Sequence, residues 1–243
     1  MTQKLHITHL YPELLNTYGD RGNIIALTKR CQWREIEVVV NRISLGDRLT
    51  AKSTDLYFIG GGQDAAQASI AKDLAKKTKV LLADVTAGVP LLAICGGYQL
   101  LGQRYVDPTG HDSAGIGLFD VITVAGSRRL VGNMLIDGSG EFASQQFIGF
   151  ENHAGRTILG STAQPFGRVI KGNGNTGDDG TEGAVVHQAI GTYLHGSLLP
   201  KNPWLTDWLI TKAIEQRTGQ PAKLKPLDNE IENQARTEAL SRF

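Results

Sequence analysis

The chain has 243 residues, of which 41% are hydrophobic, and its 25 Lys and Arg residues nearly balance its 24 Asp and Glu residues. This composition is typical of a globular protein with a sizeable core, and the balanced charge disfavours nucleic acid or an anionic membrane as the main partner. The chain has no apolar run of the ~18 residues that a membrane helix needs and no secretory signal pattern. We therefore expect a single domain over residues 1–243, cytoplasmic and without membrane insertion.

The first part of the chain alternates short apolar runs with helical patterns. We expect strands at residues 5–10, 36–43, 55–59 and 91–94, helices at about 24–31 and 98–102, and one or two helices over 64–88. The turn residues of segment 18–23 (YGDRGN) would introduce the first helix, with a cap among them. This order predicts a mostly parallel central sheet flanked by helices, with ligands at the carboxyl ends of its strands.

The second part changes to short extended pieces separated by turns, which predicts added, partly antiparallel strands. These pieces cover residues 105–106, 119–124, 130–136, 147–150, 167–170, 184–187 and 190–194. The glycine-rich segment 172–180 is expected to be a mobile loop. Two C-terminal helices are expected at 204–217 and 227–240, within about 203–243. The fold class is thus α/β.

Cys95 ends the buried run PLLAIC and precedes two glycines and the helical pattern YQLL. A strand, a tight turn and a helix would present the Cys95 side chain at the edge of the sheet, as in other nucleophile turns. The helix N-terminus would favour the thiolate form of Cys95. A buried structural cysteine is the alternative for Cys95, and Cys31 is expected to pack on the inner face of the first helix.

Three successive glycines, Gly60 to Gly62, follow the third expected strand. Such a loop needs positive φ angles or a close approach of its backbone to another group. The chain has no phosphate-loop motif, so nucleotide binding here is disfavoured. The N–H groups of this loop, together with that of Gly96, would form an oxyanion hole; a simple tight connection is the alternative.

A cysteine nucleophile needs a base, and His195 stands out among six histidines because it ends an apolar strand and precedes a glycine. His153 is the main competitor for this role. No metal site is expected, because the chain has no Cys or His pair with ligand spacing beyond the loose pair His6 and His9.

Several motifs together resemble class I glutamine amidotransferases, whose domain has a flavodoxin-like fold. These motifs are GGG at 60–62, ICGGYQ at 94–99 and YLHG at 193–196. The segment GFENHAGRT at 149–157 is similar to the cobyric-acid-synthase-like branch. Segments TYGDRGN, SRRLVGN and HGSLLPKNP resemble the glutaminase subunits of lipid II isoglutaminyl synthases. The resemblance covers nearly the whole chain.

The resemblance implies that Cys95 attacks the side-chain amide of L-glutamine and forms a glutamyl thioester, with His195 as the base. It also implies that Gln99 and the backbones of Gly61, Gly62 and Gly96 line the glutamine and oxyanion sites. Arg129, rather than Arg128, matches the family's arginine, and its guanidinium suits the glutamine carboxylate. A solvated surface arginine is the alternative reading of Arg129.

Two positions depart from the family pattern. Ala93 replaces the first glycine of the nucleophile turn, and Ser197 stands where the general family has a glutamate two residues after the histidine. A hydroxyl cannot stabilise an imidazolium as a carboxylate does. The enzyme could work as a dyad, could use Glu151 or another acid, or could take a carboxylate from its partner; we favour the partner.

The chain carries no ATP motif, so no cofactor is expected in it. The resemblance implies a heterodimer with a Mur-ligase-like synthetase subunit that uses ATP and Mg²⁺ to amidate D-glutamate of lipid II with the released ammonia. This chain would thus reach lipid II only through its partner. The alternatives are a cobalamin-type or other ammonia acceptor, a cysteine peptidase or other thiol hydrolase, and a non-catalytic binding subunit.

Overall fold

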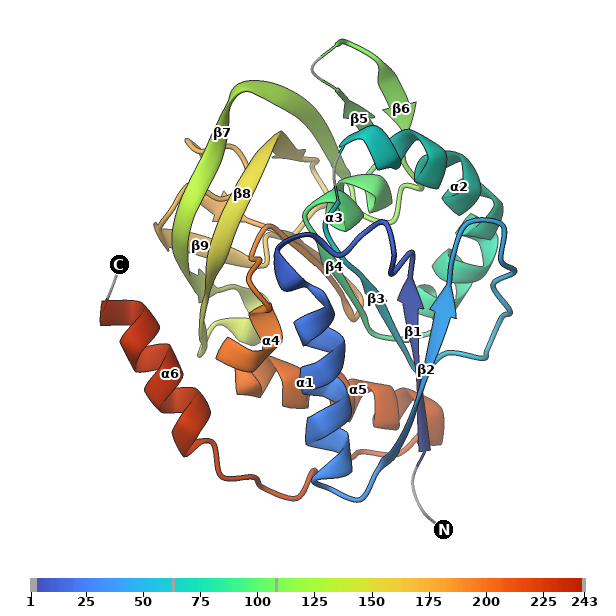
Figure 1. Ribbon diagram of the computed structural model, residues 1–243, viewed down its shortest axis with the longest axis vertical. Helices are drawn as coiled ribbons and strands as arrows, with labels where there is room; N and C mark the ends of the chain where they lie inside the picture. Colours follow the sequence, from blue (N-terminus) through green and yellow to red (C-terminus); the bar gives the residue numbers. More distant parts are fainter. Residues whose placement is uncertain (1–3, 63, 108, 242–243) are drawn as a thin grey trace.

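The computed structural model describes residues 4–62, 64–107 and 109–241, and within these ranges the strands form two six-stranded sheets (Figure 1). The first sheet has the order β11-β12-β4-β3-β1-β2. Its neighbours pair in parallel except β11 and β12, which are antiparallel. Its strands are β1 (Lys4–Leu10), β2 (Glu37–Ile43), β3 (Leu56–Ile59), β4 (Leu91–Ile94), β11 (Ala184–Val186) and β12 (Ala189–Thr192).

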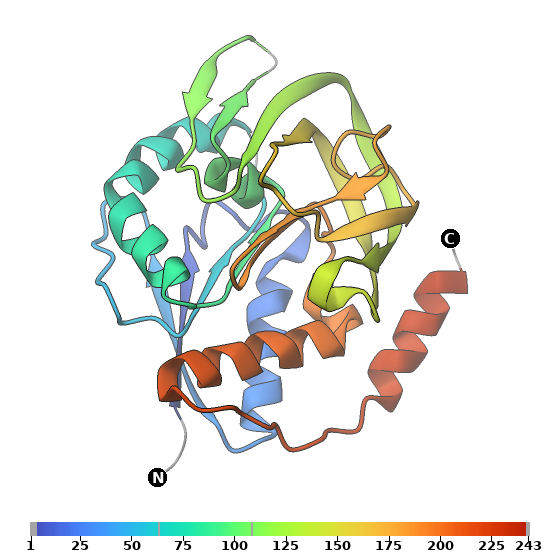
Figure 2. The ribbon, with the colours of Figure 1, turned by 180° about the vertical axis from the view of Figure 1, so that it is seen from behind.

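Helices cover both faces of this sheet, as the alternating sequence pattern predicts. Helix α1 (Arg21–Gln32) and helix α2 (Asp64–Thr86) lie on opposite faces (Figures 1 and 2). Helix α5 (Pro203–Thr218) packs against α1 and β3. Strands β3 and β4 are buried over their whole length, because both of their faces are covered.

The second sheet is built around two long antiparallel strands, β7 (Val121–Gly138) and β8 (Gln146–Leu159). The other strands of this sheet are β5 (Arg104–Val106), β6 (Asp112–Ala114), β9 (Gly167–Lys171) and β10 (Thr181–Glu182). The strands predicted at 119–124 and 130–136 are in fact one strand. A register shift between Ala125 and Leu130 breaks its alternation of apolar and polar residues, but the pairing with β8 resumes beyond it.

Strand β8 also extends much further than the four residues predicted at 147–150. Its inward positions beyond Phe150 include Glu151, His153 and Thr157, which are polar yet buried. An alternation of apolar and polar residues cannot reveal such a strand, because the side chains on its buried face are themselves polar.

The loop over 172–180, expected to be mobile, is tied to the second sheet instead. The backbone N–H groups of Asn173 and Gly174 donate hydrogen bonds to the Glu151 carboxylate at 2.7 and 3.0 Å. Asn175 is fully buried, and its side-chain amide both donates to and accepts from Gly183. These contacts hold the loop against β8 and against Gly183, which connects β10 and β11.

The C-terminal helices form where they were predicted. After α4 (Leu198–Lys201) and α5, helix α6 (Glu230–Ser241) lies along the outside of the molecule (Figures 1 and 2) and buries none of its residues. Arg236 of α6 donates hydrogen bonds to the Asn202 side chain and to the Gln146 carbonyl, both at 2.8 Å. Polar contacts thus help to hold α6 in place.

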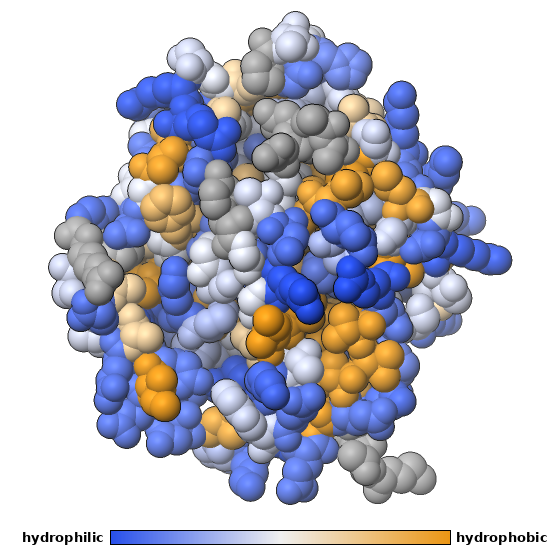
Figure 3. Space-filling model, in the orientation of Figure 1, coloured by the Kyte–Doolittle hydropathy of each residue, from blue (hydrophilic) through white to orange (hydrophobic). Residues whose placement is uncertain are grey.

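The surface is mixed rather than uniformly polar. Figure 3 shows apolar areas among charged ones on the face that carries α1 and β2. Ile25 and Trp33 are 53% and 55% exposed. None of the helices in the described ranges is long and apolar enough to cross a membrane.

The parallel strands place four chain segments at one edge of the first sheet. β1 runs into the segment containing a short 3₁₀ turn, η1 (Thr17–Gly19), and then α1. β3 runs into Gly60 to Gly62, β4 into Cys95, and β12 into His195. Because the carboxyl ends of parallel strands meet at one edge, segments far apart in the sequence come together there.

Candidate active site

Cys95 lies in the predicted turn between a strand and a helix. β4 ends at Ile94 and helix α3 (Gly96–Leu101) begins directly after the cysteine. The backbone of Cys95 has φ 48° and ψ −106°, an unfavourable conformation for a residue with a side chain. Hydrogen bonds hold this turn: the Cys95 N–H donates to the Thr192 carbonyl and the Cys95 carbonyl accepts from the Gln99 N–H. The predicted nucleophile turn is therefore confirmed as geometry.

His195 follows β12 by three residues rather than ending it. Its backbone pairs with Phe150 of β8, with the His195 N–H donating to the Phe150 carbonyl at 2.8 Å and the Phe150 N–H returning a bond of 3.2 Å. The first sheet thus delivers the histidine, and the second sheet fixes its backbone. Its side chain is fully buried.

Asp20 supplies a carboxylate to His195 from within the chain. Its Oδ1 lies 3.3 Å from Nδ1 of His195, and its Oδ2 accepts a hydrogen bond of 2.7 Å from the Gly61 N–H. Both side chains of the pair are fully buried. Sequence reasoning assigned this turn only capping chemistry, but the Asp20 side chain makes no capping bond to α1. The available signal was an acidic residue in the connection that follows the first parallel strand.

A carboxylate from within the chain thus lies beside His195, where the favoured expectation placed one from the partner. Asp20 already occupies the position beside Nδ1 of His195. Glu151, the other named acid, is used elsewhere, because it accepts hydrogen bonds from Asn173 and Gly174 and lies 3.6 Å from His153.

Gly61 shows how closely the three side chains converge. A Cβ atom placed on Gly61 would lie 2.4 Å from Cε1 of His195, 3.1 Å from Oδ2 of Asp20 and 3.2 Å from Cβ of Cys95. Any side chain at this position would displace the histidine. The glycine loop is therefore required for space at the site, which answers why the chain keeps a glycine here.

The electrostatics favour a charged histidine. Burial acts to lower the pKa of His195, but the Cys95 charge, the hydrogen bonds to Asp20 and Cys95, and the Asp20 charge outweigh it and raise the pKa to about 10. A protonated His195 beside Cys95 can donate a proton to a leaving group. The three residues can therefore perform nucleophilic chemistry with proton transfer.

Ser197, the departure from the family pattern, anchors the segment that carries Asp20. Its hydroxyl donates a hydrogen bond of 2.8 Å to the Gly19 carbonyl. A second tie links the same segments, since the Leu199 N–H donates to Oδ1 of Asn23 at 2.9 Å. The position that carries a glutamate in the general family here fastens α1 to the histidine segment.

The remaining residues predicted around the glutamine site lie in different settings. The Gly61 N–H donates a hydrogen bond to Asp20, so in this structure it already has an acceptor. Gly96 is the first residue of α3, where an N–H has no acceptor within the helix. Gly62 is packed so that a Cβ there would lie 2.3 Å from Leu15. Gln99 is nearly buried, with its Nε2 donating to the Tyr193 hydroxyl at 3.1 Å.

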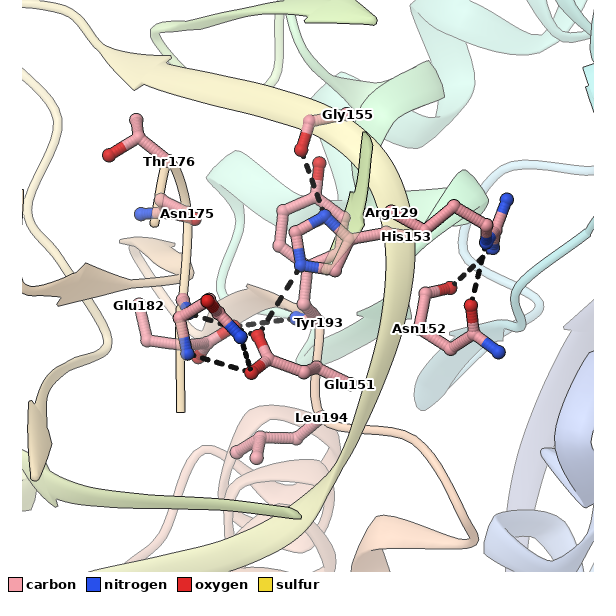
Figure 4. A network of polar contacts seen from close by, with 12 residues as sticks. Arg129, Glu151, Asn152, His153, Gly155, Asn175, Thr176, Glu182, Tyr193 and Leu194 are labelled. Carbon is pink, nitrogen blue, oxygen red and sulfur yellow. Dashed lines mark hydrogen bonds and ion pairs between the residues drawn. The ribbon is translucent and has the colours of Figure 1, made fainter. Parts of the chain in front are cut away.

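Arg129 lies in the irregular part of β7 and is exposed. Its Nε and Nη2 donate to the side-chain and backbone oxygens of Asn152 at 2.8 and 2.9 Å, which orient the guanidinium. In Figure 4, Arg129 and Asn152 lie on one side of β8, and Glu151 and Tyr193 lie on the other. The guanidinium is thus held in place without an acidic partner among the described residues.

The alternative base, His153, and the second cysteine, Cys31, lie in other surroundings. His153 stacks on the Tyr193 ring and its Nδ1 lies 2.9 Å from the Gly155 carbonyl, so its nitrogens are directed at groups other than Asp20 (Figure 4). Cys31 is fully buried, and burial, the largest influence, raises its pKa to about 12. Within the described residues no cluster of three or more metal-ligating side chains occurs.

Comparison with known proteins agrees with this geometry. Residues 6–203 match the CobB/CobQ-like glutamine amidotransferase domain family. The chain is 42% identical over 98% of its length to subunit GatD of lipid II isoglutaminyl synthase (glutamine-hydrolyzing) from Staphylococcus aureus, covering 96% of that protein. It is 38% identical over 91% of its length to the same subunit from Streptococcus pneumoniae, covering 85% of it.

Solved structures share the fold at low sequence identity. PurLQS from Thermotoga maritima aligns over 89% of this chain and 97% of the matched chain, with a TM-score of 0.58 and 16% identity. The glutaminase domain of CTPS from Trypanosoma brucei aligns over 91% and 96% of the two chains, with a TM-score of 0.56 and 9% identity. With its fold, its nucleophile turn and a family match over most of its length, the chain belongs to the CobB/CobQ-like glutamine amidotransferase family.

Proposed function

We propose that this chain is the glutaminase subunit of a lipid II isoglutaminyl synthase, hydrolysing L-glutamine to glutamate and ammonia. The observation that carries the proposal is the convergence of Cys95, His195 and Asp20 around Gly61. The two GatD subunits that are similar over nearly the whole chain support the same activity. A reduced, reactive thiol suits the cytoplasm as the place of action.

The site residues divide the chemistry among them. The Cys95 thiolate attacks the amide carbon of glutamine, and a carbon–sulfur bond forms. His195 gives its proton to the amide nitrogen as the carbon–nitrogen bond breaks, so that ammonia leaves and a glutamyl thioester remains. His195 then takes a proton from water, which attacks the thioester and releases glutamate and the thiolate. Asp20 orients and stabilises the imidazolium throughout.

Substrate binding uses the backbone at the same edge of the sheet. The Gly96 N–H at the start of α3 is placed to stabilise the oxyanion, with the glycine loop beside it. The Gly61 N–H can bind the oxyanion only if it gives up its hydrogen bond to Asp20. Arg129, oriented by Asn152, binds the glutamine carboxylate, and Gly62 shapes the loop.

The released ammonia is used by a second protein. We assign the amidation of D-glutamate in lipid II to a Mur-ligase-like partner that binds ATP and Mg²⁺. Both similar proteins are named as subunits of a lipid II isoglutaminyl synthase, which supports the existence of a partner and lipid II as the acceptor. Ile25 of α1 and Trp33, the residue after its end, are each more than half exposed and form an apolar surface of the kind that protein contacts use.

A cobalamin-type acceptor is the second candidate. Cobyric acid synthases, such as that of Photorhabdus laumondii, are 36% identical over 58% of this chain, but the match covers only 29% of that enzyme. Most of that enzyme lies outside the match. The GatD subunits match over nearly the whole chain, so lipid II is the acceptor that the comparisons favour.

The test is ammonia release from L-glutamine by the purified chain, alone and with the partner. Wild type, Cys95→Ala and the matched control Cys31→Ala are compared. We expect ammonia release by wild type and Cys31→Ala, and none by Cys95→Ala. When the partner and ATP are present, we expect the released nitrogen to be found in amidated lipid II. No release by wild type in either state would overturn the glutaminase proposal, and release without lipid II amidation would overturn the acceptor.

A further inference from the structure

The motif at 149–157 contains polar side chains that are buried, among them Glu151 and His153. Glu151 and His153 of β8 face a network centred on Tyr193 (Figure 4). The His153 ring stacks on the Tyr193 ring, with centroids 3.5 Å apart and planes 8° apart. Glu151 in turn lies beside His153 and holds the 172–180 loop. The motif therefore surrounds a tyrosine.

Tyr193 is joined to three parts of the fold by hydrogen bonds. Its hydroxyl accepts a bond of 3.1 Å from Nε2 of Gln99, on the nucleophile helix. The same hydroxyl lies 2.6 Å from Oγ1 of Thr157 on β8, which lies 2.7 Å from Oγ1 of Thr123 on β7. Its backbone N–H donates to Glu182 at 2.6 Å. One side chain thus links α3 to both long strands.

Tyr193 and Gln99 each lie close in the sequence to one of the two reacting residues. Tyr193 precedes His195 by two residues, and Gln99 follows Cys95 by one helical turn and donates its N–H to the Cys95 carbonyl. The hydroxyl is therefore connected to both chain segments that carry the reacting side chains. Burial, followed by the Cys95 charge, raises the pKa of Tyr193, so the hydroxyl stays protonated.

We propose that Tyr193 is a positioning residue for glutamine hydrolysis, whose hydroxyl sets the distance and orientation between Cys95 and His195 through Gln99 and Thr157. The inference rests on the proposed glutaminase function and adds a residue to it. It also gives Gln99 a second role, because its Nε2 is directed at this hydroxyl.

The space around the hydroxyl is kept free by a glycine of the same motif. A Cβ on Gly155 would lie 2.4 Å from Nε2 of Gln99 and 2.9 Å from the Tyr193 hydroxyl. The Gly155 carbonyl also holds His153, which stacks on the tyrosine. The motif thus controls the ring face and the hydroxyl of Tyr193 together.

The chain offers a matched control. Tyr98 is also fully buried, lies on α3 and packs edge-on against Tyr193 at 5.5 Å between centroids. Its hydroxyl has no hydrogen-bond partner within the described parts of the chain. Tyr193→Phe and Tyr98→Phe therefore each remove one buried hydroxyl, but only the first removes the link.

The experiment measures kcat and KM for glutamine hydrolysis, the pH profile of Cys95 alkylation by iodoacetamide, and thermal stability. We expect Tyr193→Phe to lower kcat about tenfold or more with KM changed less than about twofold, and to alter the alkylation profile. Tyr98→Phe should leave all three close to wild type. Thr157→Val should reproduce part of the loss, and Thr157→Ser, which keeps the hydroxyl, should restore it.

Three results would overturn the proposal. The first is an equal effect of the two tyrosine variants. The second is a lower melting temperature for Tyr193→Phe with kcat and the alkylation profile of the folded protein unchanged, because that shows a purely structural role. The third applies if wild type releases no ammonia, which would make the glutaminase proposal fail. The positioning role of Tyr193 is then tested by the alkylation profile alone. An unaltered Tyr193→Phe profile overturns the positioning role.

Discussion

Asp20 and His195 are 175 residues apart in the chain, and their side chains lie 3.3 Å apart in a fully buried pair. The carboxylate is also fixed from its other side by the Gly61 N–H. A buried carboxylate held in this way keeps the imidazole in one tautomer and orientation. The three side chains of the proposed catalytic group therefore all come from one chain.

Replacing this carboxylate should remove most of the activity. We expect Asp20→Asn to lower kcat for glutamine hydrolysis about 10²-fold or more, because an amide does not stabilise the imidazolium and favours the wrong tautomer. Asp137→Asn, at an exposed aspartate of β7 that bonds Gln146, serves as the control. Nearly full activity of Asp20→Asn, with and without the partner, would show that another acid serves His195.

The two cysteines should differ sharply toward iodoacetamide. Cys95 lies beside His195, whose pKa of about 10 keeps it protonated near neutral pH, whereas the pKa of the buried Cys31 is raised to about 12. We expect mass spectrometry of the folded protein at pH 7 to find the label on Cys95 and to find a slower reaction in His195→Ala. Equal labelling of both cysteines would contradict an activated Cys95.

Local sequence was enough to place some of these features. The turn at Cys95 could be predicted because a buried strand, glycines and a helical pattern are contiguous. The parallel sheet followed from the same kind of alternation. The contact of Asp20 with His195 could not be predicted, because it joins two segments across the sheet edge rather than neighbours in the chain. The extent of β8 was hidden because its inward residues are polar.

Arg129 should act mainly on substrate binding. Two hydrogen bonds from the guanidinium to Asn152 fix its orientation, and a lysine cannot make this fork while also pairing with a carboxylate. We expect Arg129→Lys to raise KM for glutamine about tenfold, with a smaller effect on kcat. The neighbouring Arg128→Lys is the matched control, and steady-state kinetics that show the same KM for both variants would refute this role.

Gly22 and Ser197 form a close contact that should be testable by compensation. A Cβ on Gly22 would lie 2.1 Å from the Ser197 hydroxyl oxygen. We expect Gly22→Ala to lower the free energy of unfolding by about 1–3 kcal/mol, since two packed segments must separate.

Adding Ser197→Gly should recover part of that loss. The substitution removes the clash, and Ser197 has φ 53°, which glycine adopts without strain. Urea unfolding of the single and double variants measures both effects. Additive losses in the double variant would contradict a direct contact between the two positions.

Glu182 should make stability depend on pH in an unusual direction. Its carboxyl group is fully buried, and burial, only partly offset by hydrogen bonds from Tyr193 and Thr192, raises its pKa from 4.5 to about 8. Between these two values the folded state holds a proton that the unfolded state has released. The contribution of Glu182 to stability is therefore full below about pH 4.5 and is lost as the pH rises toward 8.

Glu182→Gln should flatten this dependence. The glutamine oxygen can still accept from the Tyr193 N–H and the amide nitrogen can donate to the Thr192 hydroxyl, so the geometry is kept without a titrating group. We expect urea unfolding of wild type to show stability falling from pH 5 to pH 8 relative to Glu182→Gln, with the two curves converging at the acid end. Parallel curves over that range would mean that Glu182 is ionised in the folded protein throughout, and that the Tyr193 segment is held by a carboxylate rather than by a neutral acid.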